Sequence, residues 1–106
     1  MKTKWQIEFD FDQARRQANQ LEDIAERLES LANHQIEQSN AEIPSYWRGK
    51  SASLFQQKQE EMKKNVLASS RELRQQAELI RAIARRLYQA EMGALEIALR
   101  RTYGGN

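Results

Sequence analysis

Histidine and acidic side chains are the residues of this chain that could support catalysis or bind a metal ion. His34 is the only histidine, and its neighbours Asn33 and Gln35 offer neither a second imidazole nor a nucleophile. The chain has no cysteine, so thiolate chemistry is excluded and the redox compartment stays undetermined. Acidic clusters occur without the histidine companions and spacing of a metal-binding helix bundle. They are Glu22, Asp23, Glu26, Glu60 and Glu61. These residues predict a protein that is not an enzyme, with no catalytic residue, metal site or cofactor.

Arginines in the second half of the chain are further candidates, because a row of cations can bind nucleic-acid phosphates. On a heptad whose first core position holds Leu73, Ile80 and Leu87, these arginines fall on the outer face. They are Arg71, Arg74, Arg81 and Arg85. Glu72 and Glu78 lie between them, and no nucleic-acid motif accompanies them. We therefore interpret the row as a solvated face, and a basic coiled coil that binds nucleic acid stays a distant alternative.

The elements that position these residues begin with an arm and a helix. Apolar residues alternate with polar ones from Trp5 onward, a period of two that predicts an extended arm over residues 1–10. Asp10 and Gln13 have the spacing of a capping box, so a helix is predicted over residues 11–42. Apolar residues then repeat in alternating steps of four and three, as on the packed side of an amphipathic helix. They are Ala14, Ala18, Leu21, Ala25, Leu28 and Ala32.

The only proline, Pro44, ends this helix, because the residue before a proline disfavours helical geometry. A turn is predicted over residues 43–49. The same repeat then resumes and predicts one long helix over residues 50–101, with a tail of residues 102–106. The predicted fold class is therefore all-α, an antiparallel helical hairpin with the longer helix second, in a single domain over residues 1–106.

Trp47 and Gly49 fall in the predicted turn, between two stretches that are almost free of glycine and proline. Where two antiparallel helices meet a short loop, a residue without a side chain permits close backbone approach. A large ring can cover the end of the interhelical core. The pair is therefore predicted to form the corner of the hairpin.

Charge is divided unevenly between the two predicted helices. Residues 1–46 carry five basic and nine acidic groups, a net charge of −4, whereas residues 47–106 carry twelve and six, a net charge of +6. Folding back at the midpoint places an acidic half beside a basic half, which favours that pairing over contacts between like halves.

The predicted register leaves part of the second helix without a neighbour. If the turn centres near residue 45, Phe11 faces about Leu79, and residues from about 82 onward extend past the first helix. An exposed apolar stripe of this kind generally marks an interface, so dimerisation into a four-helix bundle is predicted. The candidate interface residues are Ile83, Leu87, Ala90, Ala94 and Ile97.

At this point the chain resembles a known family, the WXG-type small substrates of type VII (ESX) secretion. The resemblance rests on Trp47 and Gly49 in "YWRGKSASLF", and it extends from "IEFDFDQARRQANQLEDIAERLESL" to "RAIARRLYQAEMGALEIALRRTY". It implies a helical hairpin that is exported without a signal peptide, as a folded dimer, by a membrane-embedded ATPase machine.

The export signal of this family departs from its usual form here. The family places an acidic residue four positions after a tyrosine near the end of the second helix, whereas Tyr88 is followed by Glu91 at three positions and by Met92 at four. Leu87 and Glu91 do stand four apart, and Tyr88 and Glu91 still share a helix face. A degenerate signal at Leu87, Tyr88 and Glu91, reliance on a partner's signal, and ordinary packing of Tyr88 stay open as alternatives.

The resulting hypothesis is a secreted or co-secreted binding protein that forms a dimer and is recognised by the type VII ATPase. Its partner is predicted to be itself, a related helical hairpin, or the helical N-terminal region of a toxin. The alternative is a cytosolic adaptor or chaperone that binds the N-terminal region of an LXG-type toxin and targets it for export.

The hydropathy of the chain bears on its location. The longest apolar run is far below the ~20 residues that span a bilayer, and the N-terminal sequence lacks the apolar core of a cleavable signal peptide. We expect no stable membrane insertion, and secretion without a signal peptide from a cytoplasmic pool.

Overall fold

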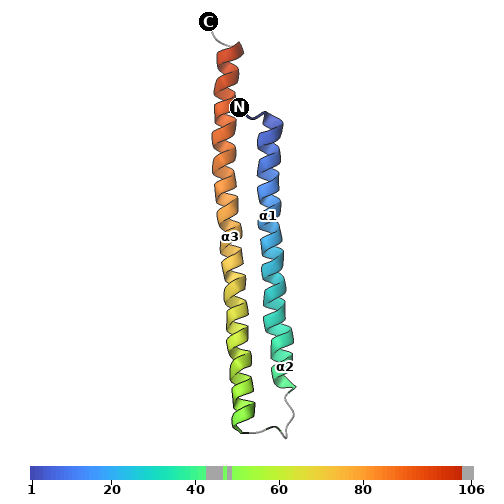
Figure 1. The fold of residues 1–106 in the computed structure, drawn as a ribbon. Helices are drawn as coiled ribbons and strands as arrows, with labels where there is room; N and C mark the ends of the chain where they lie inside the picture. The colour runs from blue at the N-terminus through green and yellow to red at the C-terminus, as the bar shows by residue number, and fades with distance from the viewer. Residues whose placement is uncertain (43–46, 48, 104–106) are drawn as a thin grey trace. The chain divides into compact units, whose positions relative to one another are not determined.

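The computed structural model describes residues 1–42, 47 and 49–103, and within them the chain is helical without any strand. Its elements are α1 (Lys4–Ser30), the π-helical segment η1 (Leu31–Ile36), α2 (Glu37–Ala41) and α3 (Lys50–Tyr103) (Figure 1). Ser30 and Glu37 keep helical backbone angles, so α1, η1 and α2 form one continuous helical run. The chain is therefore an all-α helical hairpin with the longer helix second, as predicted. Most of the predicted turn over residues 43–49 lies outside the described residues.

Helix α1 begins at Lys4, so the predicted extended arm over residues 1–10 is wrong. The reason is a capping box that lies earlier in the chain than expected. The Thr3 hydroxyl accepts a hydrogen bond from the Gln6 amide at 3.2 Å, and the Gln6 side chain accepts one from the Thr3 amide at 3.0 Å. The alternation from Trp5 onward is the overlap of two helical faces. Trp5 stacks on Phe9 at 5.2 Å on an exposed face, while Ile7 is buried.

Helix α3 continues through Tyr103, so the predicted tail of residues 102–106 starts too early. Thr102 supports this last turn, because its hydroxyl donates a hydrogen bond to the Ala98 carbonyl at 3.0 Å. Residues 104–106 lie outside the described residues.

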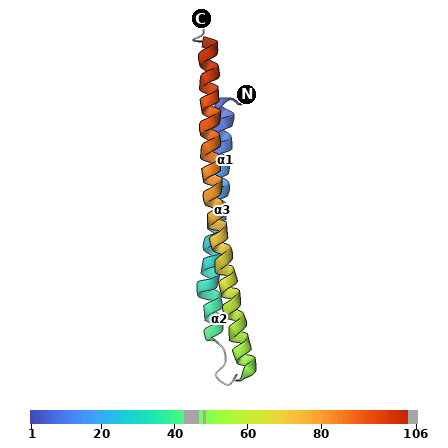
Figure 2. The same ribbon diagram turned by 90° about the vertical axis from the view of Figure 1, so that its left-hand side faces the viewer.

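The chain divides into two compact units, unit 1 of Met1–Gln20 and Gln76–Asn106 and unit 2 of Leu21–Gln75. In each unit a segment of the first helical run lies beside a segment of α3 (Figures 1 and 2). That the whole chain is a single domain stays a prediction.

Contacts within each unit show that the paired segments are antiparallel. In unit 1 the rings of Phe11 and Tyr88 have their centroids 4.8 Å apart, and Arg81 donates a hydrogen bond to Asn19 at 2.8 Å. In unit 2 the Ser70 hydroxyl donates to Glu29 at 2.7 Å, and Lys63 forms an ion pair with Glu37 at 2.7 Å. The contacts run in opposite directions along the two segments.

The register differs from the predicted one, in which Phe11 faces about Leu79. Phe11 instead contacts Tyr88, so the prediction is wrong by about nine residues. The cause lies in unit 2, where Ser39, near the end of α2, accepts a hydrogen bond from Gln59 at 3.4 Å. The end of α2 therefore lies beside the region of α3 around Gln59, and the turns of α3 from Lys50 up to that region precede it in the chain. A turn that is symmetric about residue 45 does not describe this connection.

This register also corrects the predicted overhang from residue 82. The segment of α3 around Ala84 and Tyr88 lies beside the first turns of α1, because Ile7, Phe11 and Ala14 line one hollow with it. Only the last turns of α3 extend past the start of α1 (Figures 1 and 2). The predicted overhang therefore does not explain why apolar side chains of this segment are exposed.

Small side chains form most of the buried positions. The buried residues Ala18, Ala25 and Ala32 repeat every seven residues on the first helical run, and Ser70, Ala77 and Ala84 do so on α3. Small residues allow helix backbones to approach closely, whereas the larger side chains then lie beside the contact rather than within it. The hairpin consequently buries alanine and leaves many leucine and isoleucine side chains partly in water.

Candidate functional site

A row of exposed apolar side chains follows one face of α3 in unit 1. Leu79, Ile83, Leu87 and Ile97 are 59%, 46%, 55% and 51% exposed, and the intervening Ala90 and Ala94 are exposed as well. Their steps of three and four residues place them on one helical face, which we call the apolar stripe. The stripe contains all five predicted interface residues. The exposure of Leu79, Ile83 and Leu87 arises from their lateral position on α3, whereas Ile97 lies where α3 begins to extend past the start of α1.

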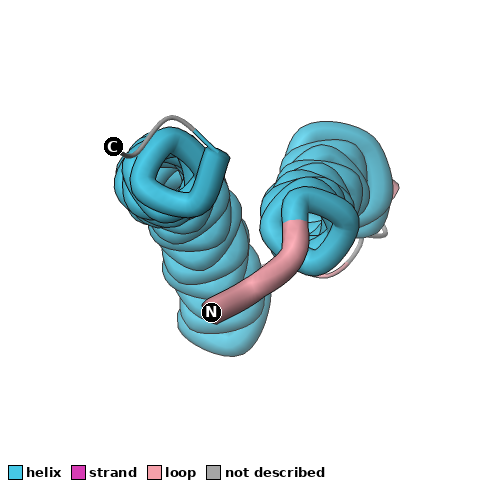
Figure 3. Tube along the Cα trace, turned by 90° about the horizontal axis from the view of Figure 1, so that it is seen from above, coloured by secondary structure: helices cyan, strands magenta, loops and turns pink. Residues whose placement is uncertain are grey.

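Tyr88 and Glu91, two of the predicted export-signal residues, lie on the side of α3 that contacts the start of the chain. The ring of Tyr88 packs against the ring of Phe11, and the carboxylate of Glu91 forms an ion pair with the Lys2 ammonium at 3.1 Å. Figure 3 shows residues 1–3 leaving the start of α1 toward α3, which brings Lys2 to this position. Leu87, the third predicted residue, is exposed on the apolar stripe. Leu87 also lines the hollow that contains Tyr88 and Glu91, so it borders both the apolar stripe and the contacts with the start of the chain.

Lys2 holds two carboxylates at once. Its ammonium lies 2.8 Å from Asp10 and 3.1 Å from Glu91. The hydrogen bond to Asp10 is the largest cause that raises the pKa of Lys2, and the hydrogen bond to Glu91 is the second. All three side chains are partly exposed to water, so each ion pair is weak.

Trp47 and Gly49, the residues of the predicted corner, lie next to the start of α3. The Trp47 ring contacts the Phe55 ring with centroids 5.2 Å apart, and the Gly49 carbonyl accepts a hydrogen bond from the Ser53 amide at 3.1 Å. Gly49 has φ +91°, and no neighbouring atom lies within 4 Å of the point that a Cβ atom would occupy there. The glycine is therefore needed for its left-handed backbone, whereas the sequence had suggested close approach of another segment.

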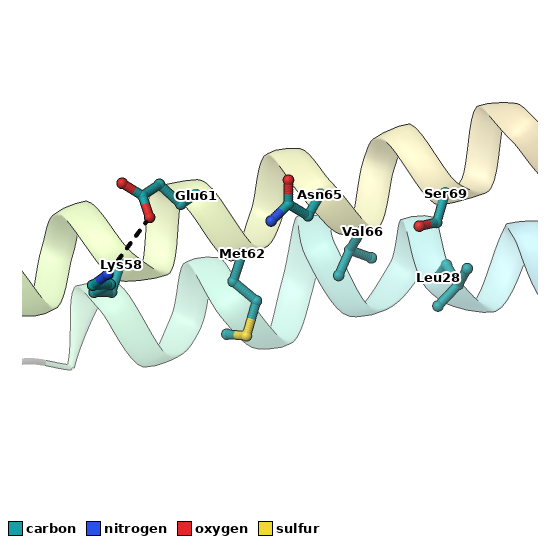
Figure 4. Close-up of a pocket in the computed structure, with 7 residues that line it drawn as sticks. All are labelled: Leu28, Lys58, Glu61, Met62, Asn65, Val66 and Ser69. Carbon is teal, nitrogen blue, oxygen red and sulfur yellow. Dashed lines mark ion pairs between the residues drawn. The ribbon is translucent and has the colours of Figure 1, made fainter.

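Unit 2 carries a second apolar surface that the sequence prediction missed. Figure 4 shows a groove lined by Leu28 of α1 and by Met62 and Val66 of α3, with the ion pair of Lys58 and Glu61 at one end. Met62 is 46% exposed, and Ile24 and Leu31, on the turns beside Leu28, are also exposed. The three- and four-residue spacing of Ile24, Leu28 and Leu31 was a signal for this surface in the sequence.

Ion pairs between the two helical segments reinforce unit 2. Arg74 contacts Glu29 through two nitrogens, at 2.8 and 3.1 Å, and the buried Ser70 hydroxyl bonds both the Glu29 carboxylate and the Ala25 carbonyl. The hydrogen bonds of Arg74 and then of Ser70 lower the pKa of Glu29 to about 2. These contacts pair the acidic first half of the chain with the basic second half, in the sense that the charge distribution favours.

We expect the Glu29→Gln variant to show a flatter acid dependence of stability than the wild-type protein. Because the folded-state pKa of Glu29 lies below its ordinary value of 4.5, its stabilising contribution is complete above about pH 4.5 and is lost as the pH falls toward 2. The difference between the two unfolding free energies, measured by urea titration from pH 7 to 2, should therefore shrink with acidification. Asp23→Asn, an exposed change on the same helix, serves as the control, and a pH-independent difference would contradict the assignment.

The described residues contain no cluster of three or more histidine, cysteine or acidic side chains that could hold a metal ion. Within the same residues, no helix has the length and apolar character required to cross a bilayer.

These features define a class of protein: a small all-α hairpin with a Trp-x-Gly sequence before its second helix and wide apolar faces in water. A family model, WXG100, described as proteins of 100 residues with WXG, matches residues 6–92. The chain belongs to the WXG100 family, small helical proteins of type VII secretion. No curated protein and no solved structure matches the chain.

Membership of this family gives the coarse function. WXG100 proteins are non-enzymatic secreted helical proteins that typically dimerise and are exported through type VII systems. The chain is accordingly a protein of the type VII secretion pathway.

Proposed function

We propose that this chain is a type VII secretion substrate that dimerises with a second copy of itself and is recognised by the export ATPase at Tyr88 and Glu91. The observation that carries the proposal is the apolar stripe, six apolar residues in water on one face of α3. The export step takes the protein from a cytoplasmic pool to the outside of the cell.

The chemistry of the apolar stripe supports a protein partner. A row of exposed aliphatic side chains is unfavourable in water, and such patches generally mark interfaces. A second hairpin that presents the same stripe would cover it, and twofold symmetry is the commonest arrangement for such a self-complementary surface. Light scattering on the purified protein tests this step. A stable monomer would instead favour a related hairpin or the N-terminal region of a toxin as the partner.

Tyr88 and Glu91 are proposed as the export signal because they combine an aromatic ring and a carboxylate on one helix face near the end of α3. Three-residue spacing on a helix brings two side chains within reach of one binding groove. The two residues belong to the helix that carries the stripe, so a dimer can present both without unfolding α3.

The export assignment is tested with the Tyr88→Ala/Glu91→Ala double variant. We expect the protein fraction in the culture medium to fall at least tenfold, while circular dichroism still reports a helical protein. Glu91→Gln, which removes only the charge, should give a smaller loss in the same direction. Gln89→Ala, on the same turn, is the control.

Unchanged secretion of the double variant would contradict the assignment of these two residues. Loss of helical signal would show that the substitution had damaged the fold, and in that case the Glu91→Gln variant decides, because Glu91 is only partly covered by Lys2.

A further inference from the structure

The two residues proposed for recognition are already engaged by the same chain. Tyr88 is half-buried with its ring on Phe11, and the Glu91 side chain is 26% exposed and paired with Lys2. A groove that reads an aromatic ring and a carboxylate needs both in contact with itself. The N-terminal residues therefore compete with any such groove for the same two side chains.

Three N-terminal residues make these contacts, and we call them the N-terminal clasp: Lys2, Ile7 and Phe11. Ile7 is 2% exposed and lines one hollow with Ala84, Tyr88 and Glu91. Lys2 reaches across to Glu91, and Phe11 lies on Tyr88. Ile7 and Phe11 stand four residues apart, so one face of α1 carries both.

We propose that the N-terminal clasp is an autoinhibitory contact: the export ATPase recognises Tyr88 and Glu91 only after the first turns of α1 have separated from α3. This regulation rests on the proposed function of Tyr88 and Glu91. It makes recognition depend on the fraction of molecules in which the clasp is open.

The composition of the clasp suits a contact that opens. The ion pairs of Lys2 are partly exposed, and such pairs contribute little. Trp5 and Phe9, two of the three large aromatic side chains of this segment, stack on each other and are 69% and 44% exposed, so they contribute little to the contact with α3. The segment also starts the first helix, where local opening costs least. Ile7 and Phe11 are thus the apolar anchors of the clasp, and Ile7 is the more deeply buried of the two.

The strength of the clasp sets how tightly the ATPase binds. If only the open form binds, the apparent dissociation constant equals the intrinsic one divided by the open fraction. A variant that raises the open fraction should tighten binding by the same factor until the open form dominates. Lys2→Glu replaces attraction to Asp10 and Glu91 with repulsion, and a change of about threefold is expected from weak surface pairs. Ile7→Ala removes buried methyl groups, and about tenfold or more is expected.

The experiment uses the full chain in four forms: wild type, Lys2→Glu, Ile7→Ala and Arg16→Glu. Arg16→Glu is the matched control, since it makes the same charge change at an exposed position of α1 that takes no part in the clasp. Hydrogen exchange of residues 7–14 reports clasp opening, because the first turns of α1 lose their packing support when they separate from α3 and then fray. Binding of each form to the purified export ATPase reports recognition, and residues 50–75 serve as the internal reference for exchange.

We expect both clasp variants to raise exchange in residues 7–14 and to tighten ATPase binding by similar factors, with Arg16→Glu unchanged in both. Faster exchange without tighter binding would overturn the autoinhibitory role, and so would weaker binding. Unchanged exchange in both variants would show that no clasp exists.

A Tyr88→Ala/Glu91→Ala form separates this proposal from the one on which it rests. If that form binds the ATPase as well as the wild type, the recognition site is wrong and the clasp falls with it. If it binds worse while the clasp variants bind no better, the recognition site stands and only the autoinhibition is wrong. Lys2→Glu keeps the test decisive should Ile7→Ala fail to fold, because Lys2 is about half exposed.

Discussion

Replacing Ile83 with glutamate should convert the proposed dimer into a monomer at micromolar concentration. Ile83 lies within the apolar stripe, between Leu79 and Leu87, and is 46% exposed in the single chain. In the proposed dimer the new carboxylate would be buried against apolar side chains without a partner, which costs several kcal/mol. A loss of about 3 kcal/mol of association free energy corresponds to a dissociation constant that is more than a hundredfold larger. Sedimentation equilibrium over a range of concentrations measures the change.

The matched control is Gln89→Glu, which introduces the same charge at an exposed position outside the stripe. It should leave the dissociation constant within about twofold, and both variants should keep the helical circular dichroism of the wild type. A dimer that survives Ile83→Glu would show that the stripe is not the contact. The groove around Leu28 and Met62 in unit 2 would then become the leading candidate.

Replacing Ala25 with leucine should destabilise the protein far more than the same substitution at an exposed alanine of unit 2. Ala25 is completely buried, and its carbonyl lies 3.1 Å from the Ser70 hydroxyl, so the backbones leave no room for a longer side chain. Overpacking typically costs about 1–3 kcal/mol, and loss of the Ser70 hydrogen bonds adds about 1 kcal/mol. For a chain of this size the midpoint of thermal unfolding should fall by about 10–20 °C.

Ala68→Leu is the matched control, because Ala68 is exposed on α3 in the same unit and has space for the added atoms. Its effect should stay within about 0.5 kcal/mol. Both variants must be melted at one protein concentration, since dimerisation makes the midpoint depend on concentration. A melting temperature of Ala25→Leu equal to that of the wild type would contradict close packing at Ala25 and Ser70.

Small residues at the helix contact have two consequences. Because alanine and serine occupy the buried positions, the helices can approach closely, and any added volume there is costly. For the same reason the larger residues lie beside the contact and remain available to a partner. In the proposed dimer these larger residues would form the interface.

Ser70 and Glu29 have a role in this packing that apolar patterning cannot fill. The buried residues repeat every seven positions on both helices, so a slip of one heptad would again place small residues opposite small ones. In the observed alignment Ser70 and Arg74 donate hydrogen bonds to Glu29. We interpret this polar cluster as a contribution to the observed register that the alanine repeat does not supply.

The amino-acid sequence alone determined the helices, the connection near Trp47 and Gly49, and the family. Helical periodicity and the effect of Pro44 are local properties, and the spacing of apolar residues follows directly from the helix repeat. The helical start at Lys4 was also readable from Thr3 and Gln6, but the alternation from Trp5 onward competed with that signal. A period of two and the overlap of two helical faces look alike over so short a segment.

Tertiary structure alone decided the register, and with it which side chains are covered and which are exposed. An alanine repeat is nearly equivalent in several alignments, so the sequence pattern could not place Phe11 against Tyr88 rather than near Leu79. The contacts that fix this alignment join residues far apart in the chain, such as Lys2 with Glu91 and Ser70 with Glu29. Exposure of the apolar stripe and closure of the N-terminal clasp both depend on these long-range contacts. Whether a side chain is covered is set by the residues of the opposite helix rather than by its neighbours in sequence.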